Sequence, residues 1–211
     1  MRGNAAFTDA ENSSSRRCGE NLLFLTNNDI TMPLFKWLEE REESVILCDG
    51  AIDAAFIQKR GVSFVVSYGY RHIIPNGVID LMGAKMVNLH ISFLPYNRGA
   101  HPNIWSFLEQ TAAGVTIHRI NDRIDGGDIL LRQRVEFDYK TETLESSYLK
   151  SHTHIQRLFK DNWTRIKRLE IAPEKQPKGG TYHSASALRP FERIIDYGDT
   201  IETFLQKAGA V

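Results

Sequence analysis

Short apolar runs alternate with amphipathic segments along most of the chain. Four runs are apolar on both faces of an extended chain and predict buried strands, at residues 22–25, 45–48, 62–68 and 85–92. Segments with helical spacing of apolar residues lie near residues 34–38, 51–59, 78–82 and 102–110. Buried strands that alternate with helices predict a doubly wound α/β fold with a mostly parallel sheet covered on both faces.

The second half of the chain changes pattern. Residues 114–120 and 129–137 predict two further strands, at a mixed or antiparallel edge of the sheet. A single apolar stripe predicts one long helix over about 142–170, and a Pro/Gly-rich connector and amphipathic tail segments follow it. We therefore divide the chain into a flexible N-terminal extension (1–20), a catalytic α/β core (21–140), and the long helix with a C-terminal extension (141–211).

Composition excludes several classes of protein. Lys plus Arg equals Asp plus Glu at 26 each, so the chain has no overall basic character for binding nucleic acid. Two cysteines without C-x-x-C spacing argue against a disulfide framework or a cysteine-based zinc site. No apolar run approaches membrane-spanning length and the polar start lacks a signal-peptide core, so a cytoplasmic protein without a membrane partner is expected.

Three polar residues near strand ends are the strongest candidates for chemistry. Asn88 and His90 lie two apart in an apolar run, so their side chains share one face of a strand. Asp125 precedes two glycines, which allow close backbone approach to a ligand. An Asn can donate to an oxyanion, a His can move protons near neutral pH, and an Asp can orient that His.

The two histidines of the long predicted helix do not suggest a metal site. His152 and His154 are two residues apart, so they point in different directions on a helix. A helical metal pair would need a spacing of three or four. We expect no metal.

The stretch NLHISFLPYNRG, followed by GVTIH and IDGGDIL, resembles the formyltransferases that use 10-formyltetrahydrofolate. The resemblance runs from about residue 22 to residue 137 and is weaker in the tail. It implies a Rossmann-like formyltransferase core in which Asn88, His90 and Asp125 are catalytic. It also implies that 10-formyltetrahydrofolate is the formyl donor.

Two further stretches look like the family's folate pocket. They are SYGYRHIIP, at residues 67–75, and residues 120–125. Backbone groups suit a flat heterocycle with several donors and acceptors, and isoleucines can line its face. By this resemblance the donor-binding residues are Tyr70, Arg71, His72, Ile73, Ile74, Ile120 and Ile124.

The loops are most similar to the small enzymes that formylate a nucleotide-linked amino sugar. That branch implies acceptor contacts from Asn97, Arg98 and Tyr182. Methionyl-tRNA formyltransferases have an additional C-terminal barrel, for which the sequence after Asp138 is short. The glycinamide ribonucleotide branch has a glycine-rich phosphate loop, whereas residues 26–31 contain no glycine.

Several alternatives stay open from the sequence. Transfer to methionyl-tRNA or to glycinamide ribonucleotide is one, and a binding protein for folate or nucleotide sugar without catalysis is another. His118 fits a functional position and a satisfied core histidine equally well. The expected partners are small molecules, and a homodimer is neither required nor excluded.

Overall fold

The computed structural model describes residues 21–42 and 44–210, so the predicted extension 1–20 lies outside the described residues. Six strands form the main sheet in the order β2-β1-β3-β4-β6-β7. They are β1 (Asn21–Leu25), β2 (Val45–Cys48), β3 (Val62–Tyr68), β4 (Met86–His90), β6 (Gly114–Arg119) and β7 (Ile129–Arg134). The first four are parallel, whereas β6 is antiparallel to both neighbours. The predicted doubly wound α/β fold with an antiparallel edge is confirmed.

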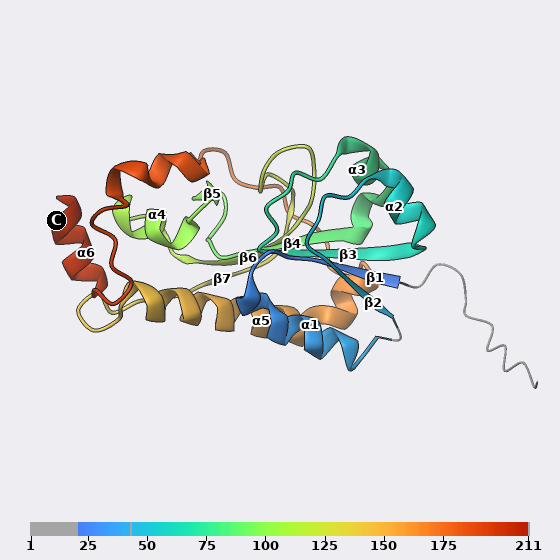
Figure 1. Cartoon of the computed structure of the whole chain (residues 1–211), viewed down its shortest axis with the longest axis horizontal. Coiled ribbons are helices and arrows are strands. Elements are labelled where there is room, and N and C mark those ends of the chain that lie inside the picture. The colour runs from blue at the N-terminus through green and yellow to red at the C-terminus, as the bar shows by residue number, and fades with distance from the viewer. Residues whose placement is uncertain (1–20, 43, 211) are drawn as a thin grey trace, which may run out of the picture.

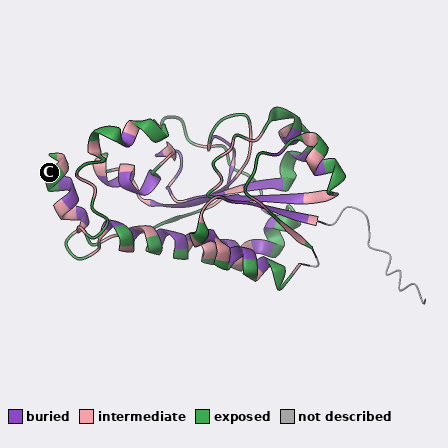
Figure 2. Cartoon of the chain, in the orientation of Figure 1, coloured by how far each residue is buried: buried purple, intermediate pink, exposed green. Residues whose placement is uncertain are grey.

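Helices cover both faces of this sheet (Figure 1). α1 (Met32–Glu39), which follows the short 3-10 turn η1 (Asp29–Thr31), and α5 (Leu144–Lys167) cover one face. α2 (Ala54–Lys59) and α3 (Asn76–Met82) cover the other, and the 3-10 turn η2 (Gly83–Lys85) leads from α3 into β4. Figure 2 shows the central strands buried between these layers.

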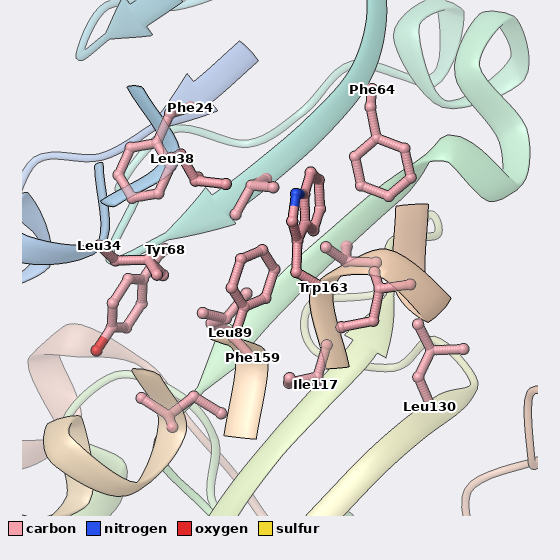
Figure 3. Packing of buried hydrophobic residues seen from close by; sticks show 14 of the residues in the cluster. Phe24, Leu34, Leu38, Phe64, Tyr68, Leu89, Ile117, Leu130, Phe159 and Trp163 are labelled. Atoms are coloured by element: carbon pink, nitrogen blue, oxygen red, sulfur yellow. The ribbon is translucent and has the colours of Figure 1, made fainter. Parts of the chain in front are cut away.

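The larger core cluster lies between the sheet and the pair α1 and α5 (Figure 3). Trp163 of α5 contacts Phe64 of β3 edge to face, with ring centroids 5.4 Å apart, and stacks on Phe159 at 5.0 Å. Burying such aromatic side chains contributes about 2–3 kcal/mol each. α5 is therefore an integral layer of the sheet domain, and the proposed boundary at residue 140 stays a prediction about chain organisation.

A third cluster lies at the N-terminal end of α5, where it includes Leu144. It joins α4 (Pro102–Leu108) to α6 (Ile201–Ala208) and to the 3-10 segment η3 (Ala185–Phe191). A two-stranded parallel sheet, β5 (Arg98–Gly99) with β8 (Tyr182–His183), lies above this cluster near the ends of β4 and β6. The C-terminal segment thus returns to the loop that follows β4.

Three predicted elements end earlier than the apolar pattern suggested. β4 stops at His90, and the chain then turns. The Ser92 hydroxyl donates to the Tyr96 carbonyl oxygen, and the Thr116 hydroxyl donates to the Ser92 carbonyl oxygen. β7 stops at Arg134, which pairs with Gly114, the first residue of β6. α5 begins at a capping box between Thr143 and Ser146 and ends before Leu169, whose φ of 58° is left-handed. None of the helices among the described residues is long and apolar enough to span a membrane.

α5 carries a buried histidine that should make the fold sensitive to acid. His152 is 4% exposed, and its Nδ1 forms a hydrogen bond with the Tyr68 hydroxyl. Burial lowers the pKa of His152 to about 4. Between about pH 6.5 and pH 4 the unfolded chain binds a proton that the folded chain does not, so stability is lost as pH falls through this window.

Replacing His152 by Gln should remove this part of the acid sensitivity. Between about pH 7 and pH 4 the wild type should lose up to about 3 kcal/mol more unfolding free energy than His152→Gln. Urea unfolding at several pH values measures the difference, and His154→Gln on the same helix is the control. Parallel pH curves for the wild type and both variants would contradict the assignment.

Candidate active site

The carboxyl end of β4 presents the first two candidate residues. Val87 and Leu89 pack into the cluster against α1 and α5, so Asn88 and His90 face away from it. β4 is paired with β3 on one side and with β6 on the other, which fixes the positions of both side chains. In this pairing Asn88 lies opposite His118 of β6.

Asp125 lies at the centre of a cluster that contains both of these side chains. Its Oδ1 accepts a hydrogen bond from Asn88 Nδ2 at 2.9 Å and lies 3.3 Å from His118 Nε2. Its Oδ2 accepts from the Gly99 backbone amide at 2.8 Å and lies 3.6 Å from His90 Nδ1. The structure therefore brings together the three residues that the sequence singled out, and it adds His118 and Gly99.

This environment keeps Asp125 ionised. Burial opposes the charge, since the side chain is only 11% exposed. The neighbouring His90, the hydrogen bond and charge of His118, and the Gly99 amide outweigh that effect and hold the pKa of Asp125 well below its usual range. The site thus contains a fixed negative charge beside two imidazoles.

The ring of His90 is oriented by a backbone carbonyl. His90 Nε2 lies 2.9 Å from the carbonyl oxygen of Asn97. Because a carbonyl only accepts, Nε2 carries a proton, and in the neutral ring Nδ1 keeps its lone pair. Nδ1 is the nitrogen on the side of Asp125, and 3.6 Å is too long for a hydrogen bond between them. His90 is therefore arranged to accept a proton at Nδ1.

His118 is tied to the same cluster on its other side. Its Nδ1 donates to the Arg119 carbonyl oxygen at 2.7 Å, so in the neutral ring Nε2 is an acceptor. Asn88 Nδ2 lies 3.1 Å from that Nε2 and directs its second hydrogen there. In the neutral ring Nε2 accepts from Asn88 and sets the orientation of the Asn88 amide, whereas in the protonated ring Nε2 donates to Asp125 Oδ1, 3.3 Å away. His118 is therefore a buried histidine with hydrogen-bond partners, and it also contacts the candidate catalytic residues.

Two cavities meet at this cluster. One, of about 780 Å³, extends toward α4 and α5, and we call it the helix-side cavity; its walls include His90, Pro102, Tyr148 and Tyr197. The other, of about 520 Å³, extends toward the loops that follow β3 and β6, and we call it the loop-side cavity. The residues that line both are Tyr70, Asn88, Gly99 and Asp125. Two ligands could therefore approach Asn88 and Asp125 from opposite sides.

The structure gathers the residues expected to bind the folate donor. All of them line the loop-side cavity, namely Tyr70, Arg71, His72, Ile73, Ile74, Ile120 and Ile124. Ile73 and Ile124 are 79% and 50% exposed, which leaves apolar surface at the cavity mouth. Such exposed apolar side chains suit the face of a flat ring.

The residues expected to contact the acceptor are placed differently. Asn97 is completely buried, its side chain bonds Thr111 and Thr181, and it lines neither cavity, so its contact with the acceptor stays a prediction. Arg98 is half-buried, directs Nε to the Thr181 carbonyl oxygen and lines neither cavity. Tyr182 lines the loop-side cavity, with the donor residues. The motif similarity placed these residues near the site but could not show which way they face.

The small sheet of β5 and β8 holds the Gly99 amide in place. A Cβ on Gly99 would lie 2.2 Å from the His183 carbonyl oxygen, so only glycine allows this close approach. The turn at Asp125 is held from another side, because Gln176 Nε2 donates to the carbonyl oxygens of Asp125 and Gly127. Gln176 lies in the Pro/Gly-rich connector, and no sequence pattern distinguished it.

In the part of the chain that the structure describes, no three His, Cys, Asp or Glu side chains are grouped so as to hold a metal ion. The polar groups at the cavity junction are instead amide, imidazole and carboxylate groups that contact one another. This set can position a proton acceptor and a hydrogen-bond donor beside a carbonyl group.

Comparison with solved structures gives the same architecture. The formyltransferase PseJ from Anoxybacillus kamchatkensis, solved with UDP-4,6-dideoxy-4-formamido-L-AltNAc and tetrahydrofolate, is 34% identical with a TM-score of 0.81. The match covers 89% of this chain and 99% of PseJ. An N-formyltransferase from Helicobacter canadensis, solved with folinic acid and dTDP-3-aminofucose, matches in fold at 19% identity and a TM-score of 0.68, over 89% of this chain and 79% of that one.

Sequence relatives span two kinds of acceptor. A methionyl-tRNA formyltransferase of Solibacter usitatus is 40% identical over 91 residues, which is 43% of this chain and 29% of that protein. The dTDP-4-amino-4,6-dideoxyglucose formyltransferase of Mycobacterium tuberculosis is 38% identical over 86 residues, 41% of this chain and 36% of that protein. The chain thus aligns with well under half the length of these two relatives. The model of the family described as formyl transferase matches residues 26–161, which include Asn88, His90 and Asp125, and the chain therefore belongs to that family.

Proposed function

We propose that this protein transfers a formyl group from 10-formyltetrahydrofolate to the amino group of a nucleotide-linked amino deoxysugar. The observation that carries the proposal is the position of Asn88 and Asp125 at the junction of two cavities. A transferase for two substrates needs one set of polar groups within reach of both. The loop-side cavity would hold the folate, and the helix-side cavity would hold the amine.

The proposed reaction begins with attack of the neutral amine on the formyl carbon. A C–N bond forms to the acceptor, and the carbonyl oxygen becomes an oxyanion. The amine then loses a proton to His90 Nδ1, and the resulting imidazolium lies beside the Asp125 carboxylate. The bond from carbon to the folate nitrogen breaks, the proton passes to that nitrogen, and tetrahydrofolate leaves.

Asn88 would stabilise the oxyanion. Its amide donates one hydrogen to Asp125 at 2.9 Å, and the other is directed at His118 Nε2 at 3.1 Å. The proposal assigns this second hydrogen to the formyl oxygen when the donor is bound. The first hydrogen bond keeps the amide nitrogen, rather than its oxygen, turned toward the reacting carbonyl.

The identity of the acceptor is supported by the relatives. PseJ, solved with a UDP-linked formamido sugar, is similar to this chain over almost its whole length. The relative from Mycobacterium tuberculosis acts on a dTDP-linked amino sugar by its name. Matches to methionyl-tRNA formyltransferases keep tRNA as the second candidate, because one of them has the highest identity quoted above.

An acceptor panel tests the proposal. The wild-type protein, with 10-formyltetrahydrofolate, should formylate at least one of three amines: the UDP-linked 4-amino precursor of the sugar seen with PseJ, dTDP-4-amino-4,6-dideoxyglucose and dTDP-3-aminofucose. Aminoacylated initiator tRNA and glycinamide ribonucleotide are the controls. Mass spectrometry should show the formyl mass on the sugar nucleotide. Formylation of the tRNA alone would exclude this acceptor class.

A binding protein without catalysis is the alternative from another class. It would bind folate and sugar nucleotide in the same panel without releasing tetrahydrofolate. The clustering of Asn88, His90 and Asp125 favours an enzyme, since binding alone requires no proton acceptor at the junction.

The cytoplasmic location and the homodimer stay predictions.

A further inference from the structure

The helix-side cavity has a donor that neither the sequence motifs nor the relatives indicate. Among the described residues that line it there is no Lys or Arg. The side chains there that can donate hydrogen bonds to an oxygen-rich ligand are therefore those of His, Asn and Tyr residues. Tyr148 of α5 lies in the wall of this cavity, together with Asn28 from the loop after β1.

Asn28 is held in one orientation by its own backbone. Its Oδ1 accepts from the Ile30 amide as the cap of η1. Its backbone amide donates to Thr26 Oγ1, and its carbonyl oxygen accepts from Thr31 Oγ1. Because the side-chain oxygen serves as the cap, the amide nitrogen must face the other way, toward Tyr148.

This orientation decides the direction of the next hydrogen bond. Asn28 Nδ2 donates to the Tyr148 hydroxyl oxygen at 2.7 Å. The oxygen is thus used as an acceptor, and its hydrogen remains to be donated. Among the described residues the structure records no acceptor for that hydrogen. The Tyr148 ring also packs on His152, with ring centroids 4.3 Å apart, which limits its rotation.

We propose that the Tyr148 hydroxyl donates a hydrogen bond to an oxygen atom of the nucleotide-linked sugar, and that Asn28 is the positioning residue that frees this hydrogen. This inference rests on the proposed function, because it concerns the same acceptor cavity. The atom recognised is an oxygen that accepts this hydrogen, on the nucleotide or on the sugar. The competing interpretation is a purely structural tie between the β1 loop and α5.

Two substitutions separate these interpretations. Tyr148→Phe removes the hydroxyl and should raise the KM for the sugar nucleotide about three- to tenfold, while the KM for 10-formyltetrahydrofolate stays unchanged. Asn28→Asp keeps the cap of η1, but a carboxylate only accepts, so the hydroxyl hydrogen turns toward it and away from the cavity. This variant should raise the same KM by a similar factor although the hydroxyl is intact.

The double variant tests whether both single changes raise the acceptor KM through the same hydroxyl hydrogen of Tyr148. With Phe at position 148, the change at Asn28 should raise the acceptor KM no further, because no hydroxyl hydrogen is left to redirect. Multiplicative effects would mean that the new carboxylate acts by its charge, and they would overturn the proposal. An unchanged acceptor KM in either single variant would overturn it as well. Tyr139→Phe and Asn162→Asp, at positions that line neither cavity, are the matched controls.

Calorimetric affinities keep this test independent of turnover. If no compound of the acceptor panel is formylated, the proposed reaction fails, but the affinities of the same compounds for the wild type and variants still decide the role of Tyr148. Absence of binding to all of them overturns the inference. Weaker binding of UDP alone to Tyr148→Phe would place the recognised oxygen on the nucleotide part, and weaker binding of the UDP-sugar only would place it on the sugar.

Discussion

Alanine at Asn88, at His90 or at Asp125 should each lower turnover by about a hundredfold or more, because loss of one oxyanion donor or proton acceptor typically has that effect. The three side chains contact one another around Asp125, so they should act as a unit. The His90→Ala and Asp125→Ala changes together should then be little worse than the more severe single change. Initial rates with a formylated panel substrate measure the effects.

Folding must be followed beside activity in these variants. Asp125 holds the Gly99 amide and Asn88, so its loss could also loosen the site. Asp125→Asn keeps the shape and removes the charge, and it should still lose most of the activity. A thermal midpoint near that of the wild type shows that the loss is chemical. Turnover close to wild type in any of these variants removes that residue from the proposed mechanism.

Alanine at Gly99 should be nearly as severe, although it adds one methyl group and removes no functional group. The new Cβ would lie 2.2 Å from the His183 carbonyl oxygen, and the residue has a φ of 89° that disfavours any side chain. The Gly99 amide must move, and with it the hydrogen bond to Asp125. A displacement of about 1 Å can lower a rate about a hundredfold.

Gly50→Ala is the matched control, because a Cβ there meets no atom within 4 Å. Gly180→Ala tests the same contact between the C-terminal segment and the loop after β4, since its Cβ would lie 2.1 Å from the Pro95 carbonyl oxygen. Both Gly99→Ala and Gly180→Ala should lower kcat/KM while circular dichroism retains the α/β signal. Full activity in a folded Gly99→Ala variant would show that the position of this amide is unimportant.

The six strands of the main sheet and the long helix were predictable from the sequence because their apolar periodicity reflects burial directly. The catalytic candidates were also predictable, since Asn88 and His90 share a strand face and Asp125 lies in a distinctive turn. Their mutual contacts then followed from the order of β4 and β6 in the sheet. The donor residues came from the motif similarity, and the structure places all of them on one cavity.

The acceptor side was less predictable for a physical reason. Whether Asn97 faces solvent depends on Thr181, which is 84 residues away in the chain. The role of Tyr148 depends on a hydrogen bond from Asn28, at a separation of 120 residues. Local patterns carry no information about such distant partners.

The pairing of β5 with β8 has a consequence for exchanging parts between related enzymes. The region matched by the family model ends at residue 161, whereas the His183 backbone and the Tyr182 side chain confine Gly99. A chimera that grafts a foreign tail after α5, intended to change only the acceptor, would also reset the geometry around Asp125. Productive grafts should therefore keep the β8 register with β5 and vary the residues beyond it.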